Sequence, residues 1–302
     1  MKILILGAGG MLGHKLMQLY SAKYDVLGTV RQDAAAYDRY RVFPQGTLIG
    51  RVDADDFASI ERAADGFGPT WIVNCIGVIK QLDAARDPLT TISINSLLPH
   101  RLAKLCSTRG IRLIHISTDC VFSGSTGMYK ESDTPDPVDL YGRTKLLGEV
   151  TGANCLTLRT SIIGRELSTR NGLLEWFLQP NHKEVRGFRR AIYSGLTTIE
   201  LARVIESVMH VRKELTGVYH VSSDPINKYD LLLLIREAFG IPTSVVAADT
   251  PSIDRSLASA RFRQAMAYTP PPWTSLIAEL AQDQTPYPPR HLPAQQQGMW
   301  RV

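Results

Sequence analysis

A glycine-rich turn close to the start of the chain restricts the folds that this sequence can adopt. Gly7, Gly10 and Gly13 come directly after an apolar run of strand length, residues 2–6, and before a stretch with helical periodicity, residues 14–20. In a strand, turn and helix of this kind, glycines let the backbone bend sharply and approach a pyrophosphate, which the free amides and the positive end of the helix dipole bind. The pattern predicts a nucleotide-binding turn.

The spacing of the glycines indicates which kind of turn this is. Gly9 adds the start of a plain G-x-G-x-x-G pattern, but that pattern requires a small residue at position 12, where Leu12 stands. The wider spacing G-x-x-G-x-x-G therefore fits better. The residues expected to line the turn around a cofactor are Gly7, Gly9, Gly10, Met11, Leu12 and Gly13.

Strand-like and helix-like stretches alternate through the first half of the chain. Further strands are expected at residues 24–30, 47–52, 71–76 and 111–116, with helices at 56–65 and 94–108. This alternation is typical of a Rossmann-like, doubly wound α/β fold with a parallel sheet, whose ligands bind at the carboxyl ends of the strands.

The pattern becomes less regular after Arg159, which predicts a second, smaller domain. An insertion is expected at residues 165–190, helices at 199–211 and 228–239, and a strand at 218–222 that rejoins the main sheet. The cofactor-binding domain would then comprise residues 1–164 and about 191–222, and the discontinuous substrate domain about 165–190 and 223–281. The proline-rich tail, residues 282–302, has little hydrophobic content and is expected to lie along the surface.

Composition restricts the location and the partners of the protein. With 302 residues, 44% of them hydrophobic and 21% charged, the chain has the make-up of an ordinary globular protein. No apolar stretch reaches membrane-spanning length and the first strand runs straight into the glycine turn, so we expect a cytoplasmic protein without membrane insertion. The net charge of +5 comes from interspersed acids and bases without an arginine-rich arm, which argues against nucleic acid as a partner.

The cysteines and histidines give no sign of a metal centre. The four cysteines contain no C-x-x-C pair, and the seven histidines lack the spacing of metal ligands, so reduced thiols and no catalytic metal are expected. The densest basic group is Arg186, Arg189 and Arg190. It has two interpretations of equal weight, an exposed loop or a grip on a substrate diphosphate.

The end of the second expected strand bears on the choice of cofactor. An acid about 20 residues after the glycine turn binds the adenosine ribose of NAD, whereas an arginine binds the 2′-phosphate of NADP. Arg31 follows this strand directly, and the first acid is Asp33. The sequence favours NADPH, with NADH as the open alternative.

Two later segments carry side chains suited to the reduction of a ketone. Hydride transfer builds negative charge on the carbonyl oxygen, so the site needs a proton donor and a second donor that holds this oxygen. We expect Tyr141 and Thr118 to supply them. Lys145 follows Tyr141 by one helical turn and is expected to lower the pKa of the tyrosine from about 10. A Tyr-x-x-x-Lys pair alone is more often a solvated helix face, and only its order behind the glycine turn favours a site.

The segment from Ser117 to Phe122 reads Ser-Thr-Asp-Cys-Val-Phe. With the glycine turn and the Tyr-x-x-x-Lys pair it resembles the extended short-chain dehydrogenase/reductase superfamily, most closely the dTDP-4-dehydrorhamnose reductases. The resemblance continues through residues 158–161, 217–222 and 268–273 and covers about residues 1–275. The sequence departs from that family's pattern in the substrate region, at residues 77–81 and 254–257, so the identity of the sugar is left open. Cys120 stands where sugar-nucleotide dehydratases carry a catalytic glutamate, so a dehydratase is not expected.

The resemblance implies roles for individual residues. Asp53 would bind the adenine amino group, and Lys145 the nicotinamide ribose. Asn95 would join a water relay behind the lysine, with a purely structural buried amide as an equal alternative. The implied cofactor set further includes Ala54, Asn74, Cys75, Ile76, Gly77, Ser117, Tyr141 and Thr160. The residues expected to bind substrate, from the resemblance and from the basic groups together, are Lys80, Thr118, Asp119, Val121, Phe122, Arg190 and Arg255.

Three functions are compatible with these residues. The first is the NADPH-dependent reduction of a nucleotide-linked 4-keto-6-deoxy sugar, which supplies a deoxysugar donor for surface polysaccharide. The second is an epimerase or epimerase-reductase, which needs an additional acid/base that the sequence does not identify. The third is a non-catalytic, NADP-binding regulatory subunit, as in the related methionine adenosyltransferase beta subunit, and the intact Thr118, Tyr141 and Lys145 argue against it. A homodimer is left open.

Overall fold

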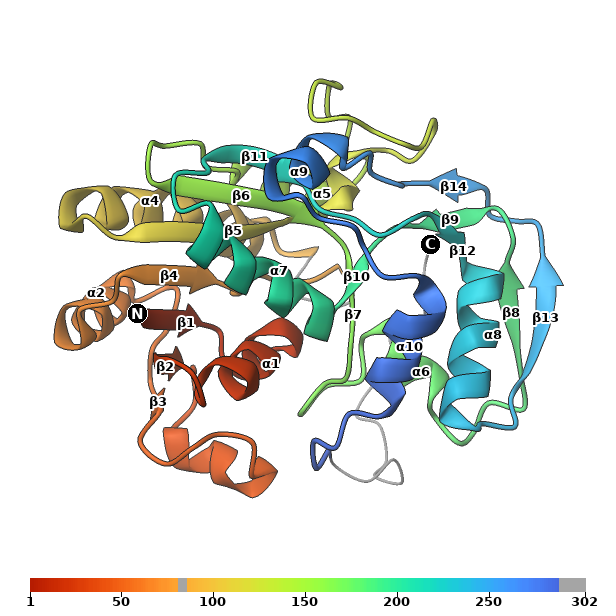
Figure 1. Cartoon of the computed structure of the whole chain (residues 1–302), viewed down its shortest axis with the longest axis horizontal. Helices are drawn as coiled ribbons and strands as arrows, with labels where there is room; N and C mark the ends of the chain where they lie inside the picture. Colours follow the sequence, from red (N-terminus) through yellow and green to blue (C-terminus); the bar gives the residue numbers. More distant parts are fainter. Residues whose placement is uncertain (81–85, 288–302) are drawn as a thin grey trace.

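A parallel sheet of seven strands forms the larger half of the molecule (Figure 1). The computed structural model describes residues 1–80 and 86–287. The strand order is β11-β6-β5-β4-β1-β2-β3, so the order reverses beside β1, as in doubly wound folds. The strands are β1 (Lys2–Leu6), β2 (Asp25–Thr29), β3 (Leu48–Ile49), β4 (Trp71–Asn74), β5 (Arg112–Thr118), β6 (Cys155–Thr160) and β11 (Gly217–His220). The predicted fold class is confirmed, and the strand expected near residue 218 does rejoin this sheet beside β6.

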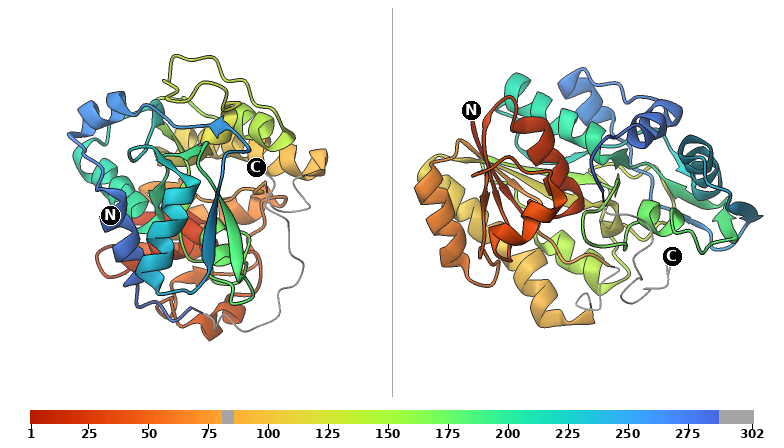
Figure 2. Two further views of the ribbon diagram at one scale, coloured as in Figure 1. Left: turned by 90° about the vertical axis from the view of Figure 1, so that its right-hand side faces the viewer. Right: turned by 90° about the horizontal axis from the view of Figure 1, so that it is seen from below.

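Helices cover both faces of the sheet (Figure 2). α1 (Met11–Tyr20), α7 (Thr198–Val211) and α9 (Ala260–Met266) pack on one face, around the buried side chains of Leu16, Ile205 and Phe262. α2 (Phe57–Phe67) and α4 (Leu98–Arg109) pack on the other face, around Ile60 and Leu102. Both faces of the central strands are therefore covered, which explains why these strands are nearly continuous apolar runs.

Short helical segments follow the strands at the carboxyl edge of the sheet. η1 (Ala34–Tyr40) follows β2, and η4 (Asp119–Val121) follows β5 without a break. α3 (Pro88–Thr91), η3 (Ile92–Leu97) and α4 run on from one another, and η3 is a single π-helical stretch. α5 (Leu140–Leu147) begins at the capping residue Asp139, whose carboxylate accepts a hydrogen bond from the Gly142 amide at 2.8 Å.

The smaller half has its own core. α6 (Leu173–Phe177), α8 (Lys228–Phe239) and α10 (Trp273–Ala281) pack around it with the parallel pair β8 (Glu184–Phe188) and β13 (Ser244–Ala248). A second small sheet has the order β12 (Ile226–Asn227), β9 (Ala191–Tyr193), β14 (Ile253–Asp254). β7 (Ile162–Ile163) and β10 (Leu196–Thr197) form a parallel pair where the chain passes between the halves. The division into a cofactor domain and a substrate domain stays a prediction.

The expected strand at residues 47–52 is much shorter than its sequence pattern suggests. β3 ends at Ile49. Gly50 lies so close to the backbone of Ala34 that a Cβ atom would not fit, and Arg51 has a φ angle of 60°. The regular strand pairing is therefore interrupted directly after Ile49, although the amide of Val52 still donates a hydrogen bond to the carbonyl of Val30 at 3.1 Å.

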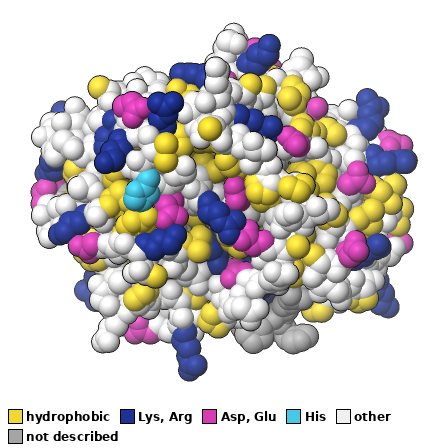
Figure 3. All heavy atoms as spheres, viewed as in Figure 1, with side chains coloured by type: hydrophobic (Ala, Val, Ile, Leu, Met, Phe, Trp, Pro, Cys, Tyr) yellow, Lys and Arg dark blue, Asp and Glu magenta, His cyan; other side chains and the backbone are white. Residues whose placement is uncertain are grey.

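The surface carries both signs of charge. On the face in Figure 3, basic and acidic side chains are interspersed, as the sequence suggested. Within residues 1–80 and 86–287, no helix has both the length and the apolar character needed to cross a bilayer.

Candidate active site

The glycine turn has the close backbone geometry that a pyrophosphate requires. Gly7 has a φ angle of 79°, and a Cβ atom on Gly13 would collide with the carbonyl oxygen of Gly7. The turn leads directly into α1, whose N-cap Gly10 offers no side chain to the first amides of the helix. These amides are available to an anionic ligand, so the residues present fit the diphosphate of a dinucleotide cofactor.

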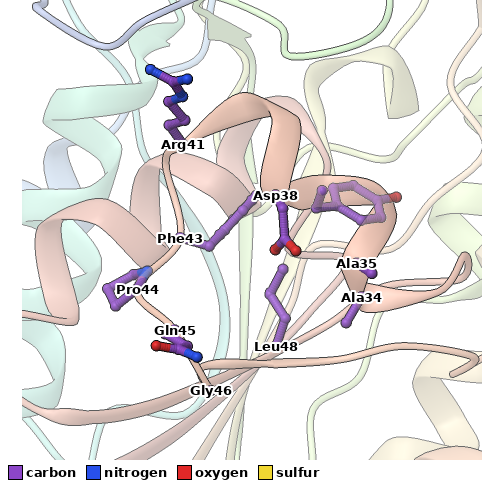
Figure 4. Close-up of a pocket in the computed structure, with 10 residues that line it drawn as sticks. Ala34, Ala35, Asp38, Arg41, Phe43, Pro44, Gln45, Gly46 and Leu48 are labelled. Atoms are coloured by element: carbon purple, nitrogen blue, oxygen red, sulfur yellow. The ribbon is translucent and has the colours of Figure 1, made fainter.

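The segment after β2 closes over one side of the turn. The ring of Tyr37 packs directly on Gly9, so that a side chain at position 9 would collide with it. Residues 34–48 surround a hollow of about 420 Å³ beside the turn, from which Arg41 points away (Figure 4). None of the residues expected to be catalytic lines this hollow. It extends the region beside the glycine turn and does not mark the site of chemistry.

Arg31 and Asp33 differ in their availability to a cofactor. Arg31 is exposed just beyond the end of β2. Asp33 caps η1 by accepting a hydrogen bond from Ala35, and its carboxylate pairs with Arg51 at 3.0 Å. The acid nearest to β2 is therefore already bound to protein groups.

Two asparagines hold the segment after β4. The side chain of Asn74 accepts a hydrogen bond from the amide of Ile76 at 3.1 Å. Asn95, in the π-helical turn, pairs with both the amide and the carbonyl of Val78, at 2.9 and 3.1 Å. Gly7 in turn packs against Cys75 and Ile76. Asn95 thus fixes the strand end beside the glycine turn, and its side chain bonds to Val78 and Thr144 rather than to Lys145.

The other residues expected to bind the cofactor lie at the ends of strands. Asp53 follows β3 and accepts a hydrogen bond from the amide of Asp55 at 3.1 Å. Ala54 packs against the core beneath α2. Thr160 ends β6 and is buried. All three lie where the sheet presents its carboxyl edge, and their contacts to a cofactor stay a prediction.

Thr118, Tyr141 and Lys145 come together at the carboxyl end of β5. Thr118 is the last residue of β5, and its hydroxyl oxygen accepts a hydrogen bond from the amide of Cys120 at 3.1 Å. α5 packs so closely on this segment that a Cβ atom on Gly142 would collide with the carbonyl of Cys120. This packing brings the Tyr141 side chain within electrostatic reach of the Thr118 hydroxyl.

Lys145 is fixed by the same strand. Its ammonium group donates a hydrogen bond to the carbonyl of Ile116 at 2.7 Å, and the side chain is only 5% exposed. The Cys75 thiol, beside the glycine turn, lies within electrostatic reach of this ammonium. The expected cofactor turn and the expected catalytic residues thus form one continuous region.

Burial has the largest effect on the pKa values of Lys145 and Tyr141. It lowers the pKa of Lys145 to about 8, against the opposing effect of Glu149 and Cys75. Burial also raises the pKa of Tyr141, and the Thr118 hydroxyl only partly opposes this. The expected lowering of the tyrosine pKa is thus wrong for this structure, because desolvation of the phenolate raises the pKa of Tyr141. Tyr141 stays protonated at neutral pH.

Glu149, which the sequence reasoning missed, lies behind the lysine. Its carboxylate forms a buried ion pair with Arg159 at 2.7 Å and accepts a hydrogen bond from Ser117 at 2.7 Å. Ser117 was expected to bind the cofactor, but its hydroxyl is used here. Glu149 follows Lys145 by four residues, just beyond the end of α5, and this spacing could have drawn attention to the acid.

The residues expected to bind substrate fall into two groups. Asp119 is buried beside Thr118, and Arg255 donates a hydrogen bond to the carbonyl of Phe122 at 2.9 Å. Val121 and Phe122, in contrast, are fully buried in a small core, where Phe122 stacks on Tyr129 at 4.2 Å. Their side chains are not brought into the site, because they pack against distant parts of the chain.

The basic residues of the expected substrate site also lie apart from one another. Arg189 pairs with Asp249 on the surface, Arg186 stacks on Phe188, and Arg190 is exposed, so the three arginines do not converge on one point. Lys80 forms an ion pair with Asp139, at 3.2 Å, beside the start of α5. Within the described part of the chain, no group of three or more His, Cys, Asp or Glu side chains is arranged to hold a metal ion.

A family model for the RmlD substrate binding domain matches residues 1–285. The chain belongs to this family. The spore coat polysaccharide biosynthesis protein SpsK of Bacillus subtilis is 26% identical to this chain and spans 96% of it and 93% of its own length. Methionine adenosyltransferase 2 subunit beta of Xenopus tropicalis is 25% identical, over 80% of this chain and 73% of its own.

A solved structure has the same fold. It is the dTDP-4-dehydrorhamnose reductase of Bacillus anthracis in complex with NADP, with a TM-score of 0.76, 21% identity, and 92% and 98% of the two chains covered. The resemblance to the extended short-chain dehydrogenase/reductase superfamily is thereby confirmed.

Proposed function

We propose that this protein is an NADPH-dependent reductase of the 4-keto group of a nucleotide-linked 4-keto-6-deoxy sugar. The observation that carries the proposal is the meeting of Thr118, Tyr141 and Lys145 at the end of β5, beside a glycine turn built for a diphosphate. The names of its relatives support the same class, since they include a polysaccharide biosynthesis protein and a dTDP-4-dehydrorhamnose reductase.

The side chains divide the chemistry between them. The cofactor, when bound, supplies the hydride. Tyr141 stays protonated at neutral pH and gives its proton to the carbonyl oxygen as negative charge develops there. Thr118 holds the same oxygen through its hydroxyl, and Lys145 stabilises the phenolate left on Tyr141. Each of these three side chains is fixed before substrate binds, so little reorganisation is needed.

The region after β2 supports NADPH over NADH. Arg31 is exposed and available for a 2′-phosphate, whereas Asp33 is held by Arg51 and by the amide of Ala35. A carboxylate engaged in this way is a poor partner for the ribose hydroxyls of NADH.

A regulatory subunit without catalysis is the second candidate, because methionine adenosyltransferase 2 subunit beta is a relative. A protein that only binds NADP has no need of the Thr118 hydroxyl close to Tyr141. An epimerase would require a further acid/base beside the sugar. Among the described residues around Thr118 there is one such group, the buried carboxyl of Asp119, and it has no assigned role in epimerisation.

The direct test is the oxidation of NADPH in the presence of 4-keto-6-deoxy sugars linked to dTDP, UDP or GDP. We expect absorbance at 340 nm to fall with at least one of them, and the product to carry a new hydroxyl at C4. NADPH binding without turnover of any of these substrates would favour the regulatory subunit. An exchange of deuterium from solvent at C3 or C5 would favour the epimerase-reductase.

A further inference from the structure

The small sheet β12-β9-β14 presents three side chains towards the carboxyl end of β5. Lys228 follows β12 as the first residue of α8, Tyr193 ends β9, and Arg255 follows β14. Because β12 and β14 pair with opposite edges of β9, these residues lie at the ends of neighbouring strands. Asp119, directly after Thr118, is within electrostatic reach of all three. The smaller half therefore contributes to the same region as the catalytic candidates.

The polar groups of these side chains are not used up by the protein. Lys228 is partly buried and makes no hydrogen bond or ion pair with the described residues. The hydroxyl of Tyr193 is buried and makes no hydrogen bond of good geometry with the described residues, although the Ser161 side chain lies nearby. Arg255 uses its Nε atom for the carbonyl of Phe122, and the rest of its guanidinium group is left for another partner.

Cationic side chains gather at this point, and Lys228 is the one without an ion pair or hydrogen bond among the described residues. Lys80 is neutralised by Asp139, with which it forms an ion pair at 3.2 Å. Asp119 lies within electrostatic reach of both Lys228 and Arg255, and Arg255 is also within reach of Asp136. Burial lowers the pKa of Lys228, against the opposing influence of Asp119, which means that the ammonium is poorly solvated as well as unpaired. An anion between Lys228 and Arg255 would relieve both deficits.

We propose that Lys228, together with Arg255, binds the diphosphate of the nucleotide-linked substrate. This inference rests on the proposed function and names a binding residue that the sequence pattern did not reveal. A lysine supplies a strong point charge for phosphate, and an arginine supplies a fork of donors. Tyr193 donates its hydroxyl to the same group, and Asp119 separates the diphosphate from Thr118. The sugar then lies between the two cations and the reacting hydroxyls.

Nucleotide binding by the full chain tests this inference without requiring turnover. Dissociation constants for UDP, dTDP and the corresponding nucleosides are measured by calorimetry for the wild-type protein and for Lys228→Met, Lys228→Arg and Lys183→Met. Lys183 is an exposed lysine of the same half and serves as the matched control. We expect Lys228→Met to weaken the better-bound diphosphate by about tenfold or more. Lys228→Arg should stay within about threefold of the wild type, and Lys183→Met should be unchanged.

The remaining measurements separate this inference from the proposed reductase activity. Lys228→Met should leave the affinity for NADPH and the weak binding of nucleosides unaltered, and it should raise KM for a substrate more than it lowers kcat. The inference is supported if the wild-type protein binds UDP or dTDP and Lys228→Met does not, even if no keto sugar is reduced. Unchanged diphosphate binding in Lys228→Met, or no diphosphate binding by the wild type, overturns it even if a keto sugar is reduced.

Discussion

At the scale of single residues, the proton donor is the assignment with the clearest consequence. Tyr141→Phe keeps the ring and its packing but removes the hydroxyl that lies near Thr118. We expect turnover to fall by about a hundredfold or more, with NADPH binding nearly unchanged, because only the proton transfer is lost. Steady-state NADPH oxidation and a fluorescence titration of NADPH measure the two effects separately.

Thr118→Val provides the comparison. It removes one contact to the carbonyl oxygen and leaves the proton donor in position, so its loss of turnover should be smaller than that of Tyr141→Phe. If Tyr141→Phe retained full activity, the proton would come from another group.

The protonation of Lys145 predicts the pH dependence of the reaction. Its pKa of about 8 means that the ammonium is charged at neutral pH and loses its proton as the pH rises through 8. Burial raises the pKa of the nearby Cys75 thiol and lowers the pKa of His115, so both groups are neutral. Tyr141 is also neutral, so Glu149 is the acid that favours the charged lysine. The rate should therefore decline on the alkaline side near pH 8.

Glu149→Gln tests this directly. Removal of the carboxylate lowers the pKa of Lys145 further, and the positive charge of the unpaired Arg159 lowers it too. The alkaline decline of kcat/KM should therefore move to lower pH by about one unit. Asp65→Asn removes the acid of a surface ion pair with Arg109 and should leave the profile unchanged. An unshifted profile in folded Glu149→Gln would mean that Glu149 has only a structural role.

At the scale of elements, local sequence patterns predicted well what short-range forces determine. The glycine turn, α1 and the helix at 228–239 were correctly predicted because apolar periodicity and backbone freedom are local properties. The length of β3 was wrong because the close approach of Gly50 to Ala34 depends on how two segments meet. Contacts between distant segments decide such boundaries, and a single sequence does not display them.

The same limit applies to side chains at the site. Thr118, Tyr141 and Lys145 carry a recognisable motif, whereas Lys228 reaches the site only because β12 pairs with β9. Phe122 belongs to the motif yet packs in the core, because Tyr129 stacks on it. A motif identifies residues that a fold needs, but it does not say which of them face the ligand.

The start of the tail, residues 282–287, is more firmly attached than its composition suggested. Asp283 forms an ion pair with Lys15 of α1 at 2.6 Å, with both side chains mostly buried. The hydroxyl of Tyr287 lies 3.0 Å from Nε2 of His14, whose Nδ1 atom donates to the carbonyl of Gly10 at 2.8 Å. This segment is thus connected through α1 to the glycine turn.

Loss of that ion pair should affect both stability and cofactor binding. Asp283→Asn leaves Lys15 buried without a counter-charge, so the free energy of unfolding should fall by about 2 kcal/mol. Burial raises the pKa of Asp283, but the hydrogen bonds from Lys15 and Thr285 lower it more, so the net pKa is lowered. The stabilisation is therefore present above the unfolded pKa of about 4 and is lost as the pH falls through the folded value. Urea unfolding at pH 7 and pH 3 measures both effects.

Asp249→Asn is the control, because its partner Arg189 lies on the surface and the pair is more than half exposed. Such a pair contributes about 0–1 kcal/mol. Asp283→Asn should also weaken NADPH binding by a few-fold, through the less ordered glycine turn. Equal stability of the two variants would show that the tail contact is incidental.

At the scale of the whole molecule, the two halves contribute different parts of one site. The carboxyl edge of the large sheet carries the glycine turn and the reacting hydroxyls, and the small sheet carries the cations opposite Asp119. A ligand that contacts both halves adds its binding free energy to the stability of the folded chain. Thermal unfolding therefore reports cofactor choice without any need for a known substrate.

NADPH should raise the melting temperature of the protein more than NADH does at the same concentration. At about a hundred times its Kd, a ligand adds about 2.7 kcal/mol, which corresponds to a rise of roughly 5 °C or more for a chain of this size. Arg31→Ala removes the exposed guanidinium that is available to the 2′-phosphate. The increase in melting temperature caused by NADPH should then fall to that caused by NADH, and the increase caused by NADH should hardly change. Arg41→Ala is the matched control, because this arginine points away from the hollow beside the glycine turn (Figure 4). If Arg31→Ala reduced the effect of both cofactors equally, Arg31 would bind a part that they share, and the preference for NADPH would need another source.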